Sequence, residues 1–239
     1  MMNMKITLLT GKIFDIEKEV DFPLKVVASK QARRLSLRID VKNRIPVLTV
    51  PKLCSKRQAL DFVKSQKQWI ETHLQKIPEQ KMFEENEKIS VAGQELIIKH
   101  CDKICGGAMV EDNILWVSGN KEFLSRRVRD FIKEQAQKYL YDLSLQKAEK
   151  IGCKVNRVVI KDTKSRWGSC SSLNNINYNW RIMLAPLKVI DYLVAHEVSH
   201  LEHQDHSTQF WNCVDDLAED LEYGKNWLKK NGRYLNQYI

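Results

Sequence analysis

The chain is 239 residues long, and its 43% hydrophobic content with ordinary glycine and proline numbers indicates a globular protein with one large or two small cores. No apolar run is long enough to span a membrane, and the run at residues 6–9 is too short for a signal peptide, so we expect no membrane partner. The six cysteines form no C-x-x-C pair, which argues against a disulfide framework and favours reduced thiols in the cytoplasm, while the net charge of +9 leaves an anionic partner open.

The N-terminal part is predicted to form strands, and it carries the basic excess. Apolar and polar residues alternate over residues 34–40, a turn follows at Asn43 and Arg44, and residues 45–50 form the returning strand of a hairpin. Residues 24–67 contain twelve Lys or Arg against two acids. This excess fits solvated strand and helix faces, and it also fits an anionic partner such as nucleic acid, a nucleotide or an acidic polypeptide. No aromatic residues alternate with the basic ones to support single-strand stacking.

A capping box marks the start of the next element. Ser55 and Gln58 have the spacing of this motif, and the helix that they open has one apolar stripe and stops before Pro78. A polar stretch that resembles a linker follows. Residues 89–99 and 108–117 then alternate enough to predict two strands.

A long helix is predicted in the middle of the chain. It begins near Asn120, has apolar residues at helical spacing and ends near Gly152. Strands are predicted at residues 155–161 and 176–183. A strongly apolar helix then begins at Pro186, because proline suits the first helical position, where its missing N–H costs nothing.

The last part of the chain is predicted to be helical. Ser207 caps a helix, and a final helix around residues 226–230 ends at Gly232. The whole pattern predicts an α+β protein. We place an N-terminal β-rich basic region with one helix at residues 1–118 and a catalytic domain at residues 119–239, in which helices pack on a small sheet.

The apolar helix carries a metal-site motif, His196-Glu197-x-x-His200. Residues four apart lie on one helix face, about one turn apart, so both imidazoles can converge on one zinc ion at ~2.0–2.1 Å. Glu197 lies one position round the helix, where a carboxylate can take a proton from a zinc-bound water and hand it to a leaving group. By itself the motif arises by accident in on the order of 1 chain in 100, but uncompensated His and Glu in so apolar a helix would be costly.

A third ligand has to come from beyond the helix. His203 would lie roughly 10 Å from His196 if the helix continued, which is too far for one tetrahedral site. We therefore assign His203 to a turn at positive φ, a conformation in which histidine is enriched, and His206 to the metal. A downstream carboxylate, Asp215 or Glu219, is the alternative, and histidine is favoured because it is the commonest metal ligand.

The C-terminal half contains a set of short motifs around the metal-site motif. They are Arg166-Trp167-Gly168-Ser169-Cys170-Ser171, Asn179-Trp180-Arg181, Ala185-Pro186, Val189-Ile190-Asp191-Tyr192, His196-Glu197-x-x-His200-Leu201 and His206-Ser207-x-x-Phe210-Trp211. Together these motifs resemble the YgjP-like metallopeptidase family, which looks like a relative of the SprT-like and WLM zinc peptidases. The basic hairpin and the helix that contains Trp69 also look like the N-terminal part of this family, so the likeness covers nearly the whole chain.

The resemblance implies a zincin-like fold with zinc on His196, His200 and His206 and with Glu197 as the catalytic acid. The chain departs from two related patterns. No methionine follows the motif, so the Met-turn of the metzincins is missing, and the zinc ribbon of SprT proteins is missing as well.

Further residues are expected to line the cleft or to support the ligands. Arg166, Trp167 and Tyr192 are candidates for the cleft, with an ion pair for Arg166 and a core position for Trp167 as the structural alternatives. Asp191 and Asp205 are candidates to accept the second N–H of a metal-bound histidine.

The function predicted is zinc-dependent hydrolysis, with another divalent metal as a variant, and a polypeptide as the substrate. Two alternatives stay open. One is a metal-dependent nucleoside triphosphate pyrophosphatase or phosphohydrolase, which the basic N-terminal part would suit, and the other is a nucleic-acid-associated protein whose metal is structural.

Overall fold

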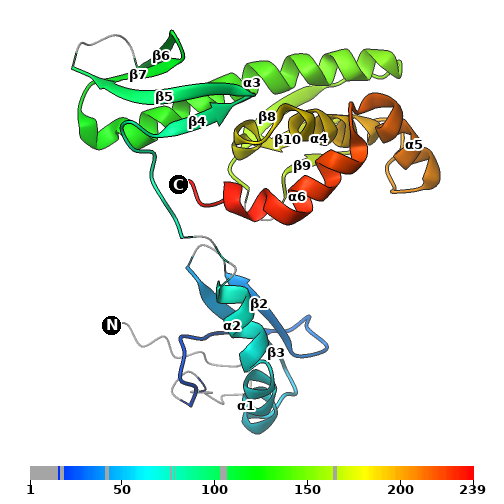
Figure 1. Cartoon of the computed structure of the whole chain (residues 1–239). Helices are drawn as coiled ribbons and strands as arrows, with labels where there is room; N and C mark the ends of the chain where they lie inside the picture. Colours follow the sequence, from blue (N-terminus) through cyan, green and yellow to red (C-terminus); the bar gives the residue numbers. More distant parts are fainter. Residues whose placement is uncertain are drawn as a thin grey trace. The chain divides into compact units, whose positions relative to one another are not determined.

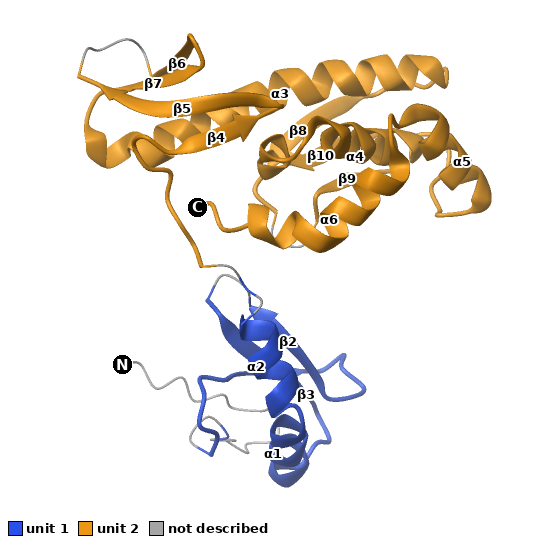
Figure 2. Cartoon of the chain, viewed as in Figure 1, with its two compact units in different colours: residues 1–78 blue, residues 79–239 orange. Residues whose placement is uncertain are grey.

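The computed structural model describes residues 16, 19–40, 43–75, 77, 79–102, 107–163 and 166–239. The chain divides into two compact units, Met1–Pro78 and Glu79–Ile239 (Figure 2). The division falls earlier in the chain than the boundary we expected after residue 118. The strands that follow residue 79 share a hydrophobic core with the helices that follow residue 119, and this common core makes them one unit.

The first unit is a mixed sheet covered on one face by helices. Its strand order is β1-β3-β2, in which β1 (Lys25–Ser29) is parallel to β3 (Ile45–Pro51) and β2 (Ser36–Asp40) is antiparallel to it. The predicted hairpin of β2 and β3 is confirmed, and Arg44 in its turn has a φ of 52°. Alternate residues of the three strands, such as Val26 and Leu48, form a core with the two helices.

The helical stretch of the first unit contains two helices where the sequence predicted one. The capping box is confirmed, because the Ser55 side chain accepts a hydrogen bond from the Gln58 backbone N–H and the Gln58 side chain bonds back. Helix α1 (Lys56–Ser65) ends at Gln66, which leaves the helical conformation, and α2 (Lys67–Gln75) follows at once. The apolar stripe continues through the break, which is why the pattern reads as a single helix.

The second unit begins with a four-stranded sheet in the order β4-β5-β7-β6. The two strands predicted here are each divided by a tight turn, giving β4 (Lys88–Val91), β5 (Gln94–Cys101), β6 (Ala108–Glu111) and β7 (Ile114–Ser118). Both turns have two consecutive residues at positive φ, Ala92 with Gly93 and Asp112 with Asn113. Such turns match the twist of a hairpin, so they reverse the chain without a longer loop.

Helix α3 (Leu124–Lys150), after a short 3-10 turn (Lys121–Phe123), is the long helix predicted from Asn120 to Gly152. Helix α3 packs against the four-stranded sheet, at β6 and β7, and against a smaller, three-stranded sheet of the same unit. That sheet has the order β8-β10-β9, with β8 (Arg157–Lys161) parallel and β9 (Gly168–Cys170) antiparallel to the central β10 (Asn175–Asn179). A 3-10 helix (Trp180–Leu184) replaces the end of the strand predicted to reach residue 183.

Three helices complete the unit (Figure 1). Helix α4 (Leu187–Ser199) packs against α3, β9, α5 (Thr208–Leu217) and α6 (Leu221–Leu235). The predicted cap at Ser207 is confirmed, but Gly232 does not end the last helix. A Cβ atom on Gly232 would lie 3.0 Å from Nε1 of Trp167, so glycine serves close packing inside α6. No helix among the described residues is long and apolar enough to cross a membrane.

Candidate metal centre and active site

Helix α4 places the first two histidines of the motif. Nine of its thirteen residues are buried, most of them in the hydrophobic core of the second unit, so the core holds the helix in place. His196 lies in the last turn and His200 is the residue that ends the helix. Nδ1 of His200 lies 3.0 Å from the backbone carbonyl oxygen of His203, so this ring is oriented by the turn that follows.

The chain turns back between His203 and Ser207. The backbone N–H of His203 donates to the Ser199 carbonyl at 2.9 Å, which extends the helical hydrogen-bonding pattern by one residue. His203 is not among the residues at positive φ, so our expectation for its conformation is wrong. The reversal comes after His203, in the turn where Asp205 accepts from the Ser207 N–H at 3.2 Å.

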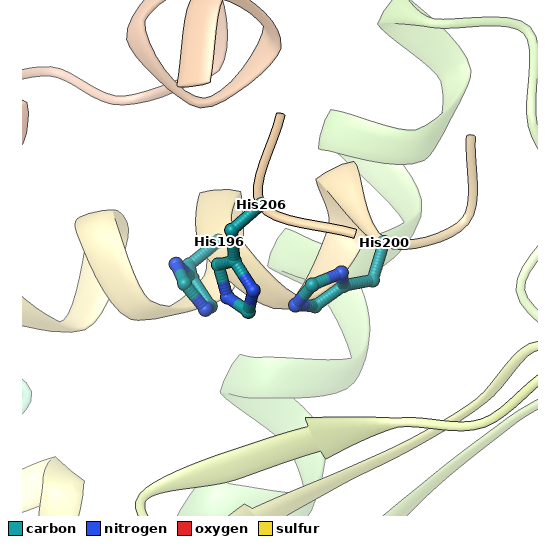
Figure 3. Close-up of side chains that lie close together, drawn as sticks. All are labelled: His196, His200 and His206. Carbon is teal, nitrogen blue, oxygen red and sulfur yellow. The ribbon is translucent and has the colours of Figure 1, made fainter. Parts of the chain in front are cut away.

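This reversal brings three imidazoles together (Figure 3). One ring nitrogen from each of His196, His200 and His206 lies within 4.8 Å of the other two. The ring centroids are 5.2, 5.3 and 4.9 Å apart for the pairs 196–200, 196–206 and 200–206. Zn–N bonds of ~2.0–2.1 Å place tetrahedral ligand atoms about 3.4 Å apart, so small ring rotations suffice for a shared ion.

The chemistry of the three donors fits a divalent cation. Burial lowers the pKa of His196 to about 4 and lowers the pKa of His200 as well, so both rings are neutral at neutral pH and have a free lone pair. Nδ1 of His196 is buried and has no hydrogen-bond partner in the described structure. A buried polar atom of this kind is costly unless something binds it, and an ion or its ligands would do so.

Glu197 lies beside the triad and is almost completely shielded from water. Its residue is 4% exposed, and burial raises the pKa of its carboxyl to about 8, with the charge of Arg166 acting in the opposite direction. Strand β9 approaches it closely at Gly168, where an added Cβ atom would lie 2.4 Å from Oε1 and 2.6 Å from Cδ of Glu197. The glutamate is therefore held between α4 and the edge strand.

Sequence reasoning did not single out Gly168 as a site residue. A glycine inside a strand often indicates that another group approaches the backbone closely, but no strand was predicted at residue 168, so this signal was not used. What the glycine approaches is Glu197, which follows it by more than two turns of helix and a strand in the chain, so only the folded structure reveals the contact.

The other predicted residues are distributed around this centre. The rings of Tyr192 and His196 are 6.0 Å apart, and burial raises the pKa of Tyr192 to about 12, so its hydroxyl stays protonated. Trp167 is half-buried against the core and Gly232, in line with the structural alternative. Arg166 is exposed.

Neither Asp191 nor Asp205 is hydrogen-bonded to a site histidine among the described residues. Asp191 lies 2.6 Å from Nζ of the buried Lys147 and accepts a hydrogen bond from the Glu219 backbone at 2.7 Å. Asp205 accepts from Ser207 in the turn. Both carboxylates therefore hold the segments that flank the site.

The alternative third ligands lie outside the cluster. Among the described residues, the group of His, Cys, Asp and Glu side chains able to share an ion consists of the three histidines. Asp215 is exposed on α5, and Glu219 lies 3.4 Å from Nζ of Lys188.

A family model described as YgjP-like, metallopeptidase domain, matches residues 33–231. The chain belongs to the YgjP-like metallopeptidase family. Membership makes it a metal-dependent peptidase in general terms, and a divalent metal is implied. The match begins in the first compact unit and includes most of the second, so both units are part of the family domain.

The family match is accompanied by one solved structure, the metallopeptidase zymogen abylysin of Pyrococcus abyssi. It is 20% identical to this chain with a TM-score of 0.36, over 42% of this chain and 98% of that one. A likeness at this level carries no inference about function. No curated protein matches the chain.

Proposed function

We propose that this YgjP-like protein is a zinc-dependent peptidase, with His196, His200 and His206 as the ligands and Glu197 as the general base and acid. One observation carries the proposal: three imidazoles with ring nitrogens within 4.8 Å of one another lie beside a buried carboxylate. This pairing of donors with an adjacent proton carrier is what hydrolysis of a carbonyl compound requires.

Each protein group has a defined part in this reaction. A zinc ion on the three histidines would supply Lewis acidity to a water molecule and to the substrate carbonyl. Glu197 accepts the proton of the attacking water and then delivers it to the leaving nitrogen. Without a cation, burial holds the pKa of Glu197 at about 8, and a neighbouring positive charge lowers it, so that the carboxylate is ionised when the site is loaded.

Strand β9 supports a peptide as the substrate. It is an edge strand of its sheet, because it pairs with β10 on one side only. Its Gly168 is in contact with Glu197, so a peptide added along the free edge would pass next to the proposed base. Backbone hydrogen bonds along an edge strand bind extended peptides without regard to their side chains.

The number of donors supports a catalytic site over a structural one. Structural zinc sites in proteins have four protein ligands, whereas catalytic sites have three and keep one position open. In the part of the chain that the structure describes, no fourth His, Cys, Asp or Glu joins the cluster.

Hydrolysis of a phosphoanhydride is the second candidate, and one observation favours it. Nζ of Lys225 lies 4.2 Å from the ring centroid of Trp211, and the ring centroids of Trp211 and His196 are 5.8 Å apart. The charge of Lys225 contributes to the lowered pKa of His196, and that of Arg166 acts on Glu197. Neither cation forms an ion pair with a described residue, so two unpaired positive charges lie near the proposed zinc site.

One experiment tests both candidates. We would determine the metal content of the purified protein and then assay casein, a peptide library and nucleoside triphosphates with the wild type, Glu197→Gln and the control Glu202→Gln, an exposed acid in the following turn. We expect about one zinc per chain, peptide cleavage, a loss of about 1,000-fold or more in Glu197→Gln, and little change in the control. Cleavage that survives in zinc-loaded Glu197→Gln would contradict the assigned base, and pyrophosphate release without peptide cleavage would favour the second candidate.

A further inference from the structure

The charge of the chain is divided unequally between its two compact units. Residues 1–78 contain sixteen Lys and Arg against seven Asp and Glu, whereas residues 79–239 contain twenty-three of each. The whole formal net charge of +9 therefore belongs to the first unit, coloured blue in Figure 2. The unit that contains the proposed peptidase site has no net charge, so the basic excess lies on a unit that carries none of the proposed zinc ligands.

The topology of the first sheet gathers cations at one of its ends. Strands β1 and β3 are parallel and end in register, with Ser29 opposite Pro51, so Lys30 and Lys52 follow directly on neighbouring strands. Strand β2 is antiparallel to β3 and starts at the same end, so Arg33 and Arg34, just before it, lie there too. All four side chains are exposed.

This end of the sheet is hollowed. A cavity of about 760 Å³ is lined by two of these cations, Arg33 and Lys52, and by no acidic residue. Its other walls are mostly apolar or neutral: Ala32, Leu35, Pro51, Leu53, Cys54 and Gln58. Leu53 in this wall is 94% exposed.

The cations at this end differ from those on the helices of the same unit in their pairing. Lys56 pairs with Glu19, and Lys67 lies 2.5 Å from the carboxylate of Asp21. Lys30, Arg33, Arg34 and Lys52 form no ion pair in the described structure. Unpaired like charges held close together repel one another, so an anion that binds among them is attracted by all of them at once.

The unpaired cations extend too far along the sheet for a single phosphate group. Lys25 and Arg38 both lie opposite Val47, on either side of it in the central strand, and both are exposed and unpaired among the described residues. At about 3.3 Å per residue, Val47 lies roughly 13 Å along β3 from Pro51. A polyanion with regularly spaced charges can contact both groups of cations.

We propose that the first unit binds the phosphate backbone of a nucleic acid strand, with the basic hollow of Arg33 and Lys52 as its centre. The guanidinium group of an arginine can donate two parallel hydrogen bonds to the oxygens of a phosphate, and a lysine adds a point charge. The hollow has no aromatic side chain among its lining residues, so bases are not held by stacking. Binding is therefore independent of base sequence and strongly dependent on salt.

The test measures binding by the full chain. Fluorescein-labelled probes of about 20 nucleotides, oligo(U), oligo(dT) and a DNA duplex, are titrated in fluorescence anisotropy at several KCl concentrations. The double variant Arg33→Gln/Lys52→Gln is compared with Lys56→Gln/Lys67→Gln, which removes the same charge from ion-paired positions on the helices. The three probes show whether RNA, single-stranded DNA or duplex DNA supplies the backbone.

We expect the wild type to bind at least one probe and the hollow variant to lose tenfold or more of this affinity at about 0.1 M salt. For a single strand, the slope of log K against log salt is expected to fall by about 1.4, the value for two lost phosphate contacts. The control variant is expected to change affinity less than threefold. Equal losses in both variants would mean that only net charge matters, and this result would overturn the assignment of the hollow.

Cys54 provides a local readout because it lines the hollow. Burial raises its pKa, so alkylation by N-ethylmaleimide is followed at about pH 8.5, with Cys153, whose pKa is also raised, as the control thiol in the second unit. A bound oligonucleotide is expected to slow alkylation of Cys54 threefold or more and to leave Cys153 unchanged. Absence of binding to all three probes, or displacement of the oligonucleotide by polyglutamate at equal charge concentration, would refute the proposal.

Discussion

The contact between Gly168 and Glu197 leads to a sharp prediction. In Gly168→Ala the new methyl group would lie 2.4 Å from Oε1 and 2.6 Å from Cδ and Cγ of Glu197. Ordinary contacts of this kind are about 3.5 Å, so one partner must move by about 1 Å. Strand β9 is held in register, since Gly168 lies opposite Tyr178 and the Trp167 carbonyl accepts from Asn179 at 2.8 Å. The glutamate side chain is therefore expected to move.

A displacement of this size has two measurable consequences. A misplacement of about 1 Å in a catalytic group costs roughly 100-fold in rate, so we expect kcat on a peptide substrate to fall by about that factor. Overpacking a buried site also costs about 1–3 kcal/mol of unfolding free energy, measured by urea denaturation. Zinc content should stay at the wild-type level, because the histidines are not the atoms that the methyl group meets.

Two further variants isolate the cause. Gly232→Ala is the matched control, because its methyl group would meet the indole of Trp167 at 3.0 Å and no atom of Glu197. Its kcat is expected to change less than threefold. In a Glu197→Asp background the shorter side chain leaves room, so Gly168→Ala should destabilise that protein much less than the wild type. Full activity and full stability in Gly168→Ala would refute the proposed contact, and equal destabilisation in both backgrounds would assign the cost to the strand itself.

Three other predictions concern residues of α4 and their partners on neighbouring segments. His206→Ala should weaken zinc binding by about 100-fold or more, measured in competition with a chelating dye. His203→Ala keeps the backbone carbonyl that orients His200, so it should bind zinc as the wild type does. Equal losses in both variants would count against the triad. Lys147→Met leaves Asp191 without its partner and should cost about 2–4 kcal/mol in urea denaturation, and a loss below about 1 kcal/mol would contradict the role of this buried pair. In EDTA, the raised pKa of Glu197 means that its contribution to stability is full below pH 4.5 and is lost as pH rises through about 8. The free energy of unfolding of Glu197→Gln should therefore gain up to about 5 kcal/mol relative to that of the wild type across this range. Parallel pH profiles of the two proteins would contradict the shift.

Local patterns were sufficient for much of the architecture. The capping box at Ser55, the long helix after Asn120 and the cap at Ser207 were all correctly predicted, because each depends on a few neighbouring residues. The hairpin turns at Ala92 and Asp112 were missed. Apolar residues continue on both sides of these turns, so periodicity alone does not show where the chain reverses.

The candidate metal site combines local and distant information. His196 and His200 share a face by helix geometry, which sequence spacing expresses directly. The return of His206 was inferred from the number of residues in between, and its place within 4.8 Å of the other rings is a property of the turn. The positive φ assigned to His203 was wrong, because this residue still donates its backbone N–H to Ser199 and the chain reverses after it.

From its sequence alone this chain is an α+β protein with a basic N-terminal part and a pair of histidines positioned for zinc on one apolar helix, since periodicity, caps and charge are properties of neighbouring residues. The tertiary structure decided what surrounds that helix: the close approach of Gly168 to Glu197, the pairing of Asp191 with Lys147, and the division of the chain after Pro78. These contacts join residues that are distant in the chain, and they form only when several elements pack against one core, so no local pattern encodes them.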